Sequence, residues 1–245
     1  MNIFQSKKNV PAYPGFSWLA QDIHSHILPG IDDGSPDVET SLQLLRSLSD
    51  VGINKFICTP HIISDMYRNT PETINAALAI LKKACLQNGM QTEISAAAEY
   101  MLDDYFMELL RKKKPLLTLT KNYILTELSY STSPDNLEQI SFEINTNNYQ
   151  PLMAHPERYF YYHKNYNAYY RLKELGFLLQ VNLLSLTGYY GKNVAKAAKF
   201  ILENGLADFV GTDLHHFNHL KVLTDAKSVE LFEKYLGDRV YNQFA

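Results

Sequence analysis

The chain has 245 residues, of which 46% are apolar and 20% charged, so it is long enough for one well-buried domain. A formal charge of −3, with a single short basic run at residues 111–114, argues against nucleic acid as a partner. Neither an apolar stretch of about 18 residues nor a signal-peptide pattern is present, so we expect a cytoplasmic protein without membrane insertion. Two cysteines, Cys58 and Cys85, are too few for a disulfide framework.

Short apolar runs alternate with longer helical patterns along the chain, which is typical of βα units and a parallel sheet. The predicted strands, in chain order, cover residues 22–24, 55–59, 93–98, 123–127, 151–155, 178–182 and 208–212. The first two helices have clear signals, because Ser35-Pro36 and Thr70-Pro71 are capping pairs and Gly52 and Gly89 are stops. Further helices are predicted over residues 134–145, 165–175 and 194–203, and from about residue 224.

Polar side chains of the metal-binding kind lie at or just beyond the ends of the predicted strands. In chain order they are His24 and His26, His61, Glu99, Glu127, His155, Asn182, and Asp213 with His215. The carboxyl ends of the strands in a parallel barrel meet on one face, so we expect these side chains to converge there. Because His24 and His26 are two residues apart, both imidazoles point to the same side of an extended segment. The pattern predicts a metal site at the mouth of a barrel.

Five histidines and up to four carboxylates exceed the ligands of one ion, and Glu99 or Glu127 can bridge neighbouring ions. We therefore expect two to three divalent ions, with manganese as the first choice and iron or zinc as alternatives that the nitrogen and oxygen donors also suit. Such ions activate water and neutralise charge on phosphoryl or carbonyl oxygens, so hydrolysis is the expected reaction. Phosphate monoesters, whose uncatalysed hydrolysis is very slow, suit a site of this charge density.

Other nucleophiles are excluded by their motifs. A Cys-x5-Arg loop is absent, because Ser64 stands six positions after Cys58 and Gln91 six positions after Cys85. The sequence also lacks a Gly-x-Ser-x-Gly elbow and a Gly-x4-Gly-Lys-Ser/Thr loop. Metal-activated water remains as the nucleophile, and Arg158 can offer its planar guanidinium to phosphate oxygens.

The motifs resemble those of the polymerase and histidinol phosphatase (PHP) superfamily, and more narrowly its bacterial tyrosine-protein phosphatase branch of the CpsB/CapC/YwqE kind. They follow in order as Asp22-Ile-His-Ser-His, Gly30-Ile-Asp-Asp-Gly, Cys58-Thr-Pro-His, Ala97-Ala-Glu-Tyr, Thr126-Glu, Ala154-His-Pro-Glu-Arg and Thr212-Asp-Leu-His. The resemblance implies an α/β fold, a distorted (β/α)7 TIM-like barrel of the PHP type. It also implies one phosphatase domain over residues 1–245, with residues 1–20 as an N-terminal extension.

The resemblance further implies a protein-tyrosine phosphatase that uses a metal-activated hydroxide, with a tyrosine autokinase of capsule or exopolysaccharide synthesis as its phosphotyrosine protein partner. The implied ligands are His24, His26, Glu99 and Asp213 for one ion; Glu99, Glu127 and His155 for a second; and Asp33, His61 and His215 for a third. Arg158 matches a phosphate-binding arginine of the family, and Arg158, Asp33 and His215 are the expected catalytic residues. Where the family often has a second arginine, this chain has His216, His219 and Lys221, of which we expect His219 to bind substrate.

Three alternatives remain open from the sequence. The first is a phosphatase of the same superfamily that acts on histidinol phosphate or another small phosphoester. The second is a metal-dependent amidohydrolase, which would usually carry a bridging lysine where this chain has Glu127. The third is a non-catalytic PHP module, which would typically have lost some of the nine ligands. The aromatic residues 159–163 and 166–170 are expected to pack the following helix, or else to line a slot for a phosphotyrosine ring.

Overall fold

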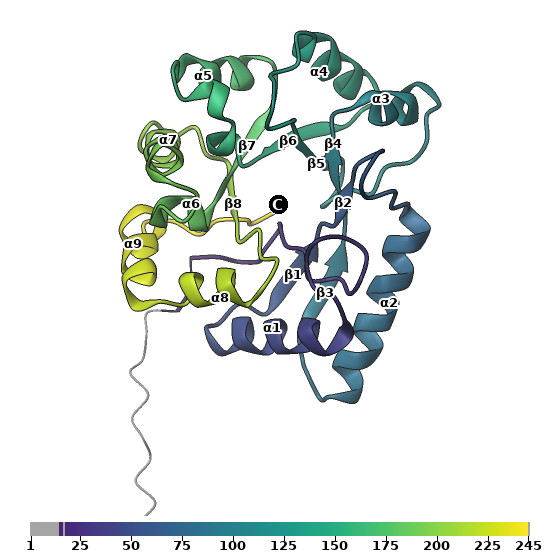
Figure 1. Cartoon of the computed structure of the whole chain (residues 1–245), viewed down its shortest axis with the longest axis vertical. Coiled ribbons are helices and arrows are strands. Elements are labelled where there is room, and N and C mark those ends of the chain that lie inside the picture. Colours follow the sequence, from purple (N-terminus) through teal and green to yellow (C-terminus); the bar gives the residue numbers. More distant parts are fainter. Residues whose placement is uncertain (1–14, 17, 245) are drawn as a thin grey trace, which may run out of the picture.

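The computed structural model describes residues 15–16 and 18–244, and its strands form a ring that the helices surround (Figure 1). The strands are β1 (Lys55–Cys58), β2 (His61–Ile62), β3 (Glu93–Ala96), β4 (Glu99–Met101), β5 (Tyr123–Glu127), β6 (Gln150–Ala154), β7 (Leu178–Asn182) and β8 (Phe209–Gly211). The α-helices are α1 (Val38–Asp50), α2 (Pro71–Gln87), α3 (Asp104–Arg111), α4 (Leu137–Thr146), α5 (Asn167–Glu174), α6 (Leu183–Thr187), α7 (Lys192–Glu203), α8 (Phe217–Leu223) and α9 (Ala226–Leu236). Two 3₁₀ turns, η1 (Pro156–Arg158) and η2 (Phe160–Tyr162), follow β6.

All pairings between these strands are parallel. Strands β2, β4, β5, β6, β7 and β8 form one sheet in that order, and β1 pairs with β3 in a second. The segment after the N-terminal extension joins the two, since Asp22 bridges Phe56 of β1 and Ser25 bridges Leu214 beyond β8. Its contact with the last strand segment includes a hydrogen bond from Asp213 N to His24 O at 2.7 Å. The predicted barrel of parallel strands is confirmed, but the predicted strand 22–24 is present only as these isolated bridges.

The predicted strands 55–59 and 93–98 each differ from the structure, because each continues as two short strands. The first is interrupted at Thr59-Pro60, where proline lacks the N–H that a regular ladder needs. The adjacent segment, between β3 and β4, follows the same bend, since Glu99 N donates to Pro60 O at 3.0 Å. After this bend, His61 of β2 pairs directly with Glu99 of β4. The irregularity therefore brings two polar side chains together at the carboxyl ends of the strands.

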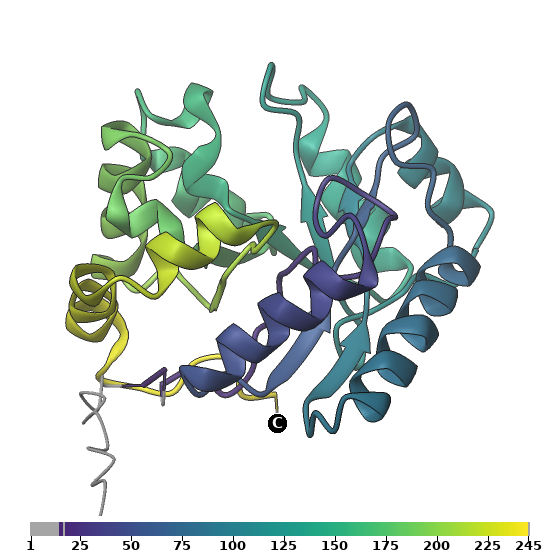
Figure 2. The same cartoon turned by 60° about the horizontal axis from the view of Figure 1, so that its bottom comes forward.

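Aromatic side chains close the other end of the barrel. The interior holds small and aliphatic side chains, and below them Tyr123, Phe209 and Phe244 pack against one another. The ring centroid of Phe244 lies 5.8 Å from that of Tyr123 and 5.3 Å from that of Phe209. The described chain accordingly ends near the middle of the ring in Figure 1 and on its lower side in Figure 2. The amino ends of the strands are therefore filled by aromatic side chains.

Helix boundaries depend on local capping. The predicted start of α2 is confirmed, since Thr70 and Thr73 exchange side-chain and backbone hydrogen bonds in a capping box. The predicted start of α1 at Ser35-Pro36 is wrong, because Asp37 caps the helix by accepting from Thr40 N at 2.8 Å. Helices α3, α6 and α8, which are five to eight residues long, were not assigned ranges from the sequence.

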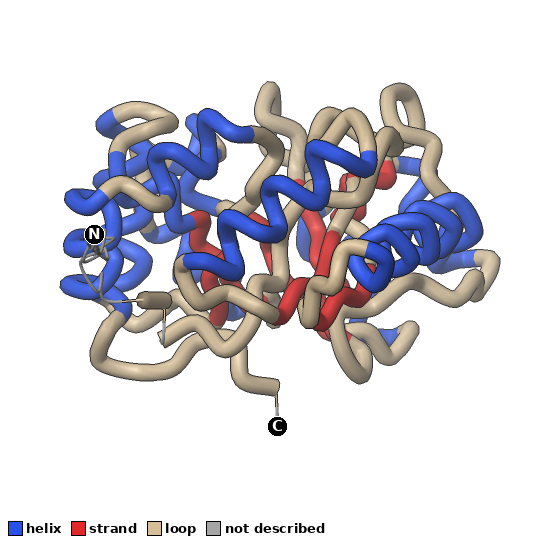
Figure 3. Tube along the Cα trace, turned by 90° about the horizontal axis from the view of Figure 1, so that it is seen from below, coloured by secondary structure: helices blue, strands red, loops and turns tan. Residues whose placement is uncertain are grey.

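The described part of the N-terminal extension packs on the outer helices. Phe16 and Trp18 are buried, and their ring centroids lie 6.0 and 6.4 Å from that of Phe232 on α9. Pro11 and Pro14 lie outside the described residues. Figure 3 shows the strands in the middle of the molecule with helices on either side. In the described part of the chain, no helix combines the length and apolarity needed to cross a membrane.

Candidate metal centre

All nine residues predicted as metal ligands meet at the carboxyl ends of the strands. We call this set the His-carboxylate cluster: His24, His26, Asp33, His61, Glu99, Glu127, His155, Asp213 and His215. Its members form four overlapping groups, in each of which the candidate ligand atoms lie within 4.8 Å of one another. The groups are His26, Asp33, His61 and His215; His24, His26 and Asp213; His24, Glu99 and His155; and His61, Glu99 and Glu127. Residues from six separate segments therefore converge as the sequence predicts.

His24 and His26 turn the same ring nitrogen toward the cluster. Gln180 Oε1 lies 2.8 Å from His24 Nδ1, and Asp32 Oδ2 lies 2.8 Å from His26 Nδ1. Each Nδ1 thus has an acceptor, which leaves each Nε2 free to act as a metal ligand. The two Nε2 atoms are 3.4 Å apart, and each lies 3.3 to 3.4 Å from oxygens of Glu99 and Asp213. The predicted chelate geometry of the pair is therefore present.

A second part of the cluster surrounds Glu99. Oε1 of Glu99 lies 3.0 Å from His155 Nε2, and its Oε2 lies 3.1 Å from His61 Nδ1. Glu127 Oε1 approaches the same His61 Nδ1 at 2.9 Å. The implied ligand set of Glu99, Glu127 and His155 thus differs from the observed grouping, in which Glu127 lies with His61 and His155 lies with His24.

The exposed edge of the cluster contains Asp33 and His215. Asp33 Oδ1 lies 3.5 Å from His61 Nε2 and 3.6 Å from His215 Nε2, and the Asp33 side chain is 50% exposed. The rings of His26 and His215 stack at a centroid distance of 4.0 Å. This grouping matches the implied third ion site, with His26 added to it.

The local backbone explains how two strand ends present their side chains. His155 follows β6 with φ 35°, and Asp213 follows β8 with φ 50°, both in the left-handed region that non-glycine residues rarely adopt. Such strain concentrates at functional sites. Only glycine fits at position 34, because a Cβ there would lie 1.9 Å from His26 O. The loop with the two aspartates can therefore pack closely over His26.

The electrostatics of the cluster favour cations. Glu99 Oε2 and Glu127 Oε1 are buried 3.1 and 2.9 Å from His61 Nδ1, and none of the three atoms makes a hydrogen bond of regular geometry within the described residues. Burial and His26 would lower the pKa of His61, but Glu99 and Glu127 raise it to about 10. Burial lowers the pKa of His155 to about 4, so its imidazole is neutral, as a metal ligand requires. Closely spaced buried carboxylates and the neutral imidazole of His155 fit divalent ions, and a bound cation would replace the proton that Glu99 and Glu127 favour on His61.

Arg158 lies beside the cluster, as predicted. Its Nη1 donates to Asp213 Oδ2 at 2.7 Å, and its side chain is 22% exposed. The guanidinium lies 5.1 Å from the ring centroid of Tyr130 and 4.2 Å from that of Tyr190. The sequence did not single out these two tyrosines, because they lie in loops without periodicity. The motif Gly188-Tyr-Tyr-Gly191, two aromatic residues between turn glycines, is the signal that was available.

Further side chains support the cluster: Asn182, predicted at its strand end, and Gln180, Glu157 and Ser185, whose roles the sequence did not indicate. Asn182 Nδ2 donates to Asp213 Oδ2 at 2.6 Å, and Gln180 donates to Asn182 Oδ1 at 2.9 Å. Glu157 Oε1 accepts from Asn182 N and from Ser185 Oγ at 2.9 and 2.7 Å, which ties η1 to the start of α6. A buried glutamine inside an otherwise apolar strand was the available sequence signal.

His219 and the aromatic run after Arg158 lie outside the cluster. His219 is buried on α8, with Nδ1 3.2 Å from Asp213 O and its ring centroid 5.5 Å from that of His215. Tyr159 is fully buried, and its hydroxyl donates to Ala154 O and accepts from Leu128 N. Tyr162 and Tyr169 are also buried, whereas Phe160 and Tyr170 are exposed, so only part of the run packs in the core, and the aromatic rings beside Arg158 come from other loops.

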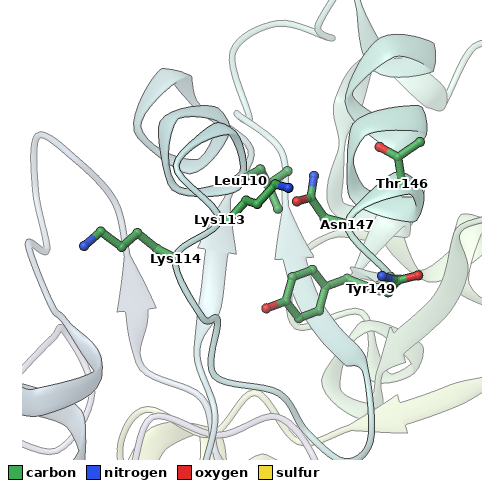
Figure 4. A pocket seen from close by; sticks show the side chains of 7 residues that line it. Leu110, Lys113, Lys114, Thr146, Asn147 and Tyr149 are labelled. Carbon is green, nitrogen blue, oxygen red and sulfur yellow. The ribbon is translucent and has the colours of Figure 1, made fainter.

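A surface hollow of about 230 Å³ lies far from the cluster, between the C-terminal ends of α3 and α4 (Figure 4). Its lining residues are Leu110, Lys113, Lys114, Thr146, Asn147, Asn148 and Tyr149. These helix ends precede β5 and β6, so the hollow lies toward the amino ends of the strands. Its lining contains neither histidine nor carboxylate.

Comparison with known proteins agrees with this geometry. The chain is 29% identical over 219 residues to the tyrosine-protein phosphatase YwqE of Bacillus subtilis (strain 168), covering 89% of this chain and 86% of that protein. It is 26% identical over 225 residues to the putative tyrosine-protein phosphatase CapC of Staphylococcus aureus, covering 90% and 88%.

Solved structures show the same relation. A crystal structure from the set of YwqE from Bacillus subtilis and CpsB from Streptococcus pneumoniae, described as unique metal-dependent tyrosine phosphatases, matches with TM-score 0.78 at 29% identity. The match covers 88% of this chain and 87% of that one. An amidohydrolase from Mycoplasma synoviae, 13% identical with TM-score 0.53 over 89% of this chain and 80% of its own, shares the fold alone. The sequence matches the family described as capsular polysaccharide synthesis, CpsB/CapC, over residues 20–244, and the chain belongs to that family.

Proposed function

We propose that this chain is a metal-dependent protein-tyrosine phosphatase, and that its substrate is a phosphotyrosine protein, specifically a tyrosine autokinase of capsule or exopolysaccharide synthesis. The observation that carries the proposal is the His-carboxylate cluster, whose nine members lie together at the mouth of the barrel. Membership of the CpsB/CapC family, and the phosphatase names of the relatives, support the choice of substrate.

The cluster residues would hold two to three divalent ions, manganese first and iron or zinc as alternatives. The overlapping groups support more than one ion, since His24, His26, His61 and Glu99 each belong to two groups. Once bound, the ions would supply an activated water nucleophile and neutralise charge on the phosphate oxygens. Gln180 and Asp32 orient the rings of His24 and His26, because each accepts a hydrogen bond from Nδ1 of its histidine.

The substrate would meet the exposed edge of the cluster. We assign catalytic roles to Arg158, Asp33 and His215, whose side chains are partly exposed at the opening, and contact with the phosphate to Arg158. Arg158 uses one of its five N–H donors on Asp213 among the described residues, so the others can bind phosphate oxygens. His219 remains our proposal for a further substrate contact, from its place beside His215.

The test is phosphate release from a phosphotyrosine peptide by the purified, metal-loaded protein. We expect release to stop with a chelator and with His155→Ala, and to survive Cys58→Ser and Cys85→Ser. His163→Ala is the matched histidine control, because His163 Nε2 bonds to Glu157 O outside the cluster. Loss of activity in folded cysteine variants would contradict the mechanism, and faster turnover of histidinol phosphate than of the peptide would contradict the substrate.

A further inference from the structure

The loop between α6 and α7 presents two tyrosines in a tight turn. Gly188 ends α6 with φ 83° and Gly191 precedes α7 with φ 101°, both left-handed values that favour glycine. Gly191 N donates to Gly188 O at 2.9 Å, so Tyr189 and Tyr190 occupy the two central positions of a hydrogen-bonded turn. Tyr189 is 41% exposed, whereas Tyr190 turns toward Arg158.

The ring of Tyr190 lies on the guanidinium of Arg158. The distance from Arg158 Cζ to the ring centroid is 4.2 Å, and the ring of Tyr130 lies 5.1 Å away. Asp213 fixes Nη1 of the same guanidinium at 2.7 Å. A cation that packs against aromatic faces and is bonded at one corner has few alternative orientations. The remaining N–H donors of Arg158 are thus held in a defined direction.

The hydroxyl of Tyr190 is a buried polar group without a partner. Its oxygen is inaccessible to solvent, and no described residue makes a hydrogen bond to it. Burial, followed by the carboxylate of Asp213, raises the pKa of Tyr190, so the hydroxyl keeps its proton and can donate. A buried donor without an acceptor is unfavourable unless a ligand supplies the acceptor. The charged groups that act on it are Asp213 of the cluster, Arg158 at the exposed edge of the site, and the more weakly acting Glu157.

We propose that Tyr190 donates a hydrogen bond through its hydroxyl to the phosphoryl group of the substrate, while its ring holds Arg158 in position for the same phosphate. This inference rests on the proposed function and adds a second phosphate-binding side chain to it. A phosphoryl oxygen supplies the acceptor that the buried hydroxyl lacks within the described chain.

Inorganic phosphate is the probe for the first experiment. Its dissociation constant is measured by calorimetry on protein loaded with Mn²⁺, and elemental analysis checks that every variant carries the same metal. We expect Tyr190→Phe, which keeps the ring and removes the hydroxyl, to weaken phosphate binding about tenfold, the size of one hydrogen bond to a charged group. Tyr189→Phe removes a hydroxyl from the same turn and is expected to change binding less than about twofold. Equal phosphate affinity of Tyr190→Phe and the wild type would overturn the proposal.

Kinetics with a phosphotyrosine peptide give a second readout. Tyr190→Phe is expected to raise KM about tenfold with kcat within about threefold, because the lost bond contributes to binding the phosphate. Tyr190→Leu also removes the ring, so Arg158→Lys should cost less affinity in that background than in the wild type. Additive effects of the two substitutions would overturn the positioning role of the ring.

The outcomes separate this inference from the proposed function. If the wild type binds phosphate with the expected Tyr190 dependence but does not hydrolyse the peptide, the proposed function fails and the phosphate contact stands. If the wild type hydrolyses the peptide and Tyr190→Phe matches it in both KM and phosphate affinity, only the contact fails. If metal-loaded wild type neither binds phosphate nor hydrolyses the peptide, both fail.

Discussion

The adjacent aspartates Asp32 and Asp33 have different roles because their side chains leave the loop in different directions. Asp32 is buried and accepts from His26 Nδ1, from Gly34 N and, at 3.3 Å, from His61 N. Asp33 is half exposed and reaches His61 and His215 instead. The preference for Asp33 as the ligand came from the resemblance and stays a prediction, while Asp32 orients a neighbouring ligand. Two identical adjacent residues give no sequence signal for this division.

Removing the Asp32 carboxylate should weaken metal binding without unfolding the chain. We expect Asp32→Ala to lower metal affinity about 10- to 100-fold, because His26 loses the acceptor that fixes its ring. The affinity is measured by competition with a chelator, and circular dichroism checks the fold. Asp65→Ala, at an exposed aspartate, is the control and should match the wild type. Unchanged metal affinity in Asp32→Ala would show that the loop does not need this contact.

Cys58 should be unreactive in the folded protein. Burial raises the pKa of its thiol from 9.0 to about 12, so the thiolate is scarce at pH 8. A raised pKa adds stability that is fully present below pH 9 and is lost as the pH rises toward 12. In Cys85→Ser protein, where Cys58 is the remaining thiol, we expect iodoacetamide at pH 8 to label only molecules that unfold. Mass spectrometry follows the label, and fast labelling of folded protein with loss of activity would contradict the metal-based mechanism.

At the scale of elements, a buried side-chain contact helps to close the barrel between its first and last segments. Asp22 Oδ1 accepts from Thr212 N at 3.0 Å and Oδ2 from Thr212 Oγ1 at 2.5 Å, across 190 positions of sequence. Both residues are fully buried, and each lies within two positions of a cluster member. The contact therefore joins the two segments that bring His24 and Asp213 together.

Thr212→Val should destabilise this closure. Valine keeps the shape but removes the donor to a buried carboxylate, so we expect the free energy of unfolding to fall by about 1–3 kcal/mol. Thr126→Val is the matched control: its hydroxyl is equally buried but donates to the neutral Leu152 O, so its loss should be smaller, about 1 kcal/mol. Urea unfolding at unchanged m-value measures both. An equal fall in the free energy of unfolding in both variants would mean that the bond to Asp22 stabilises the fold no more than the bond to Leu152 O does.

The regular elements were predictable because buried parallel strands have continuous apolar runs. Strands β5 and β7 cover the predicted ranges 123–127 and 178–182, and the capping box of α2 appears where Thr70-Pro71 predicts it. The breaks at Thr59-Pro60 and Ala97-Ala98 depend on pairing between distant segments, which periodicity cannot show. Two neighbouring residues, Ser35 and Asp37, can both cap a helix. Asp37 caps α1, where the sequence predicted Ser35.

At the scale of the whole molecule, the cluster was predictable because parallel topology converts strand ends into neighbours. Each of its members could be proposed from its place after an apolar run or within a motif, and all nine meet. Which ligands would share an ion could not be predicted in full. Glu127 lies beside His61, which follows the bend at Pro60, and the sequence does not show this bend. Tyr130 and Tyr190 reach Arg158 from loops whose course no pattern in the sequence determines.

The cluster should also hold the barrel together when it contains metal. Its ligands come from the segment after residue 22, from β2, β4 and β5, and from the turns after β6 and β8, so bound ions would link the first segment to the last. Without cations, the carboxylates of Glu99 and Glu127 remain close together, and one buried oxygen of each makes no regular hydrogen bond within the described residues. Metal that binds only the folded chain adds about 2.7 kcal/mol for each site at a hundredfold excess over its Kd.

We therefore expect chelation to lower the melting temperature by roughly 5–10 °C for each ion lost, and added Mn²⁺ to restore it. Calorimetry measures the shift, and elemental analysis confirms that the chelated sample is metal-free. In His155→Ala the chelator should have a smaller effect, because one group of ligands is already incomplete, whereas His163→Ala should behave as the wild type. A metal-free wild type that melts at the same temperature as the loaded protein would show that the strand ends converge without help from the ions.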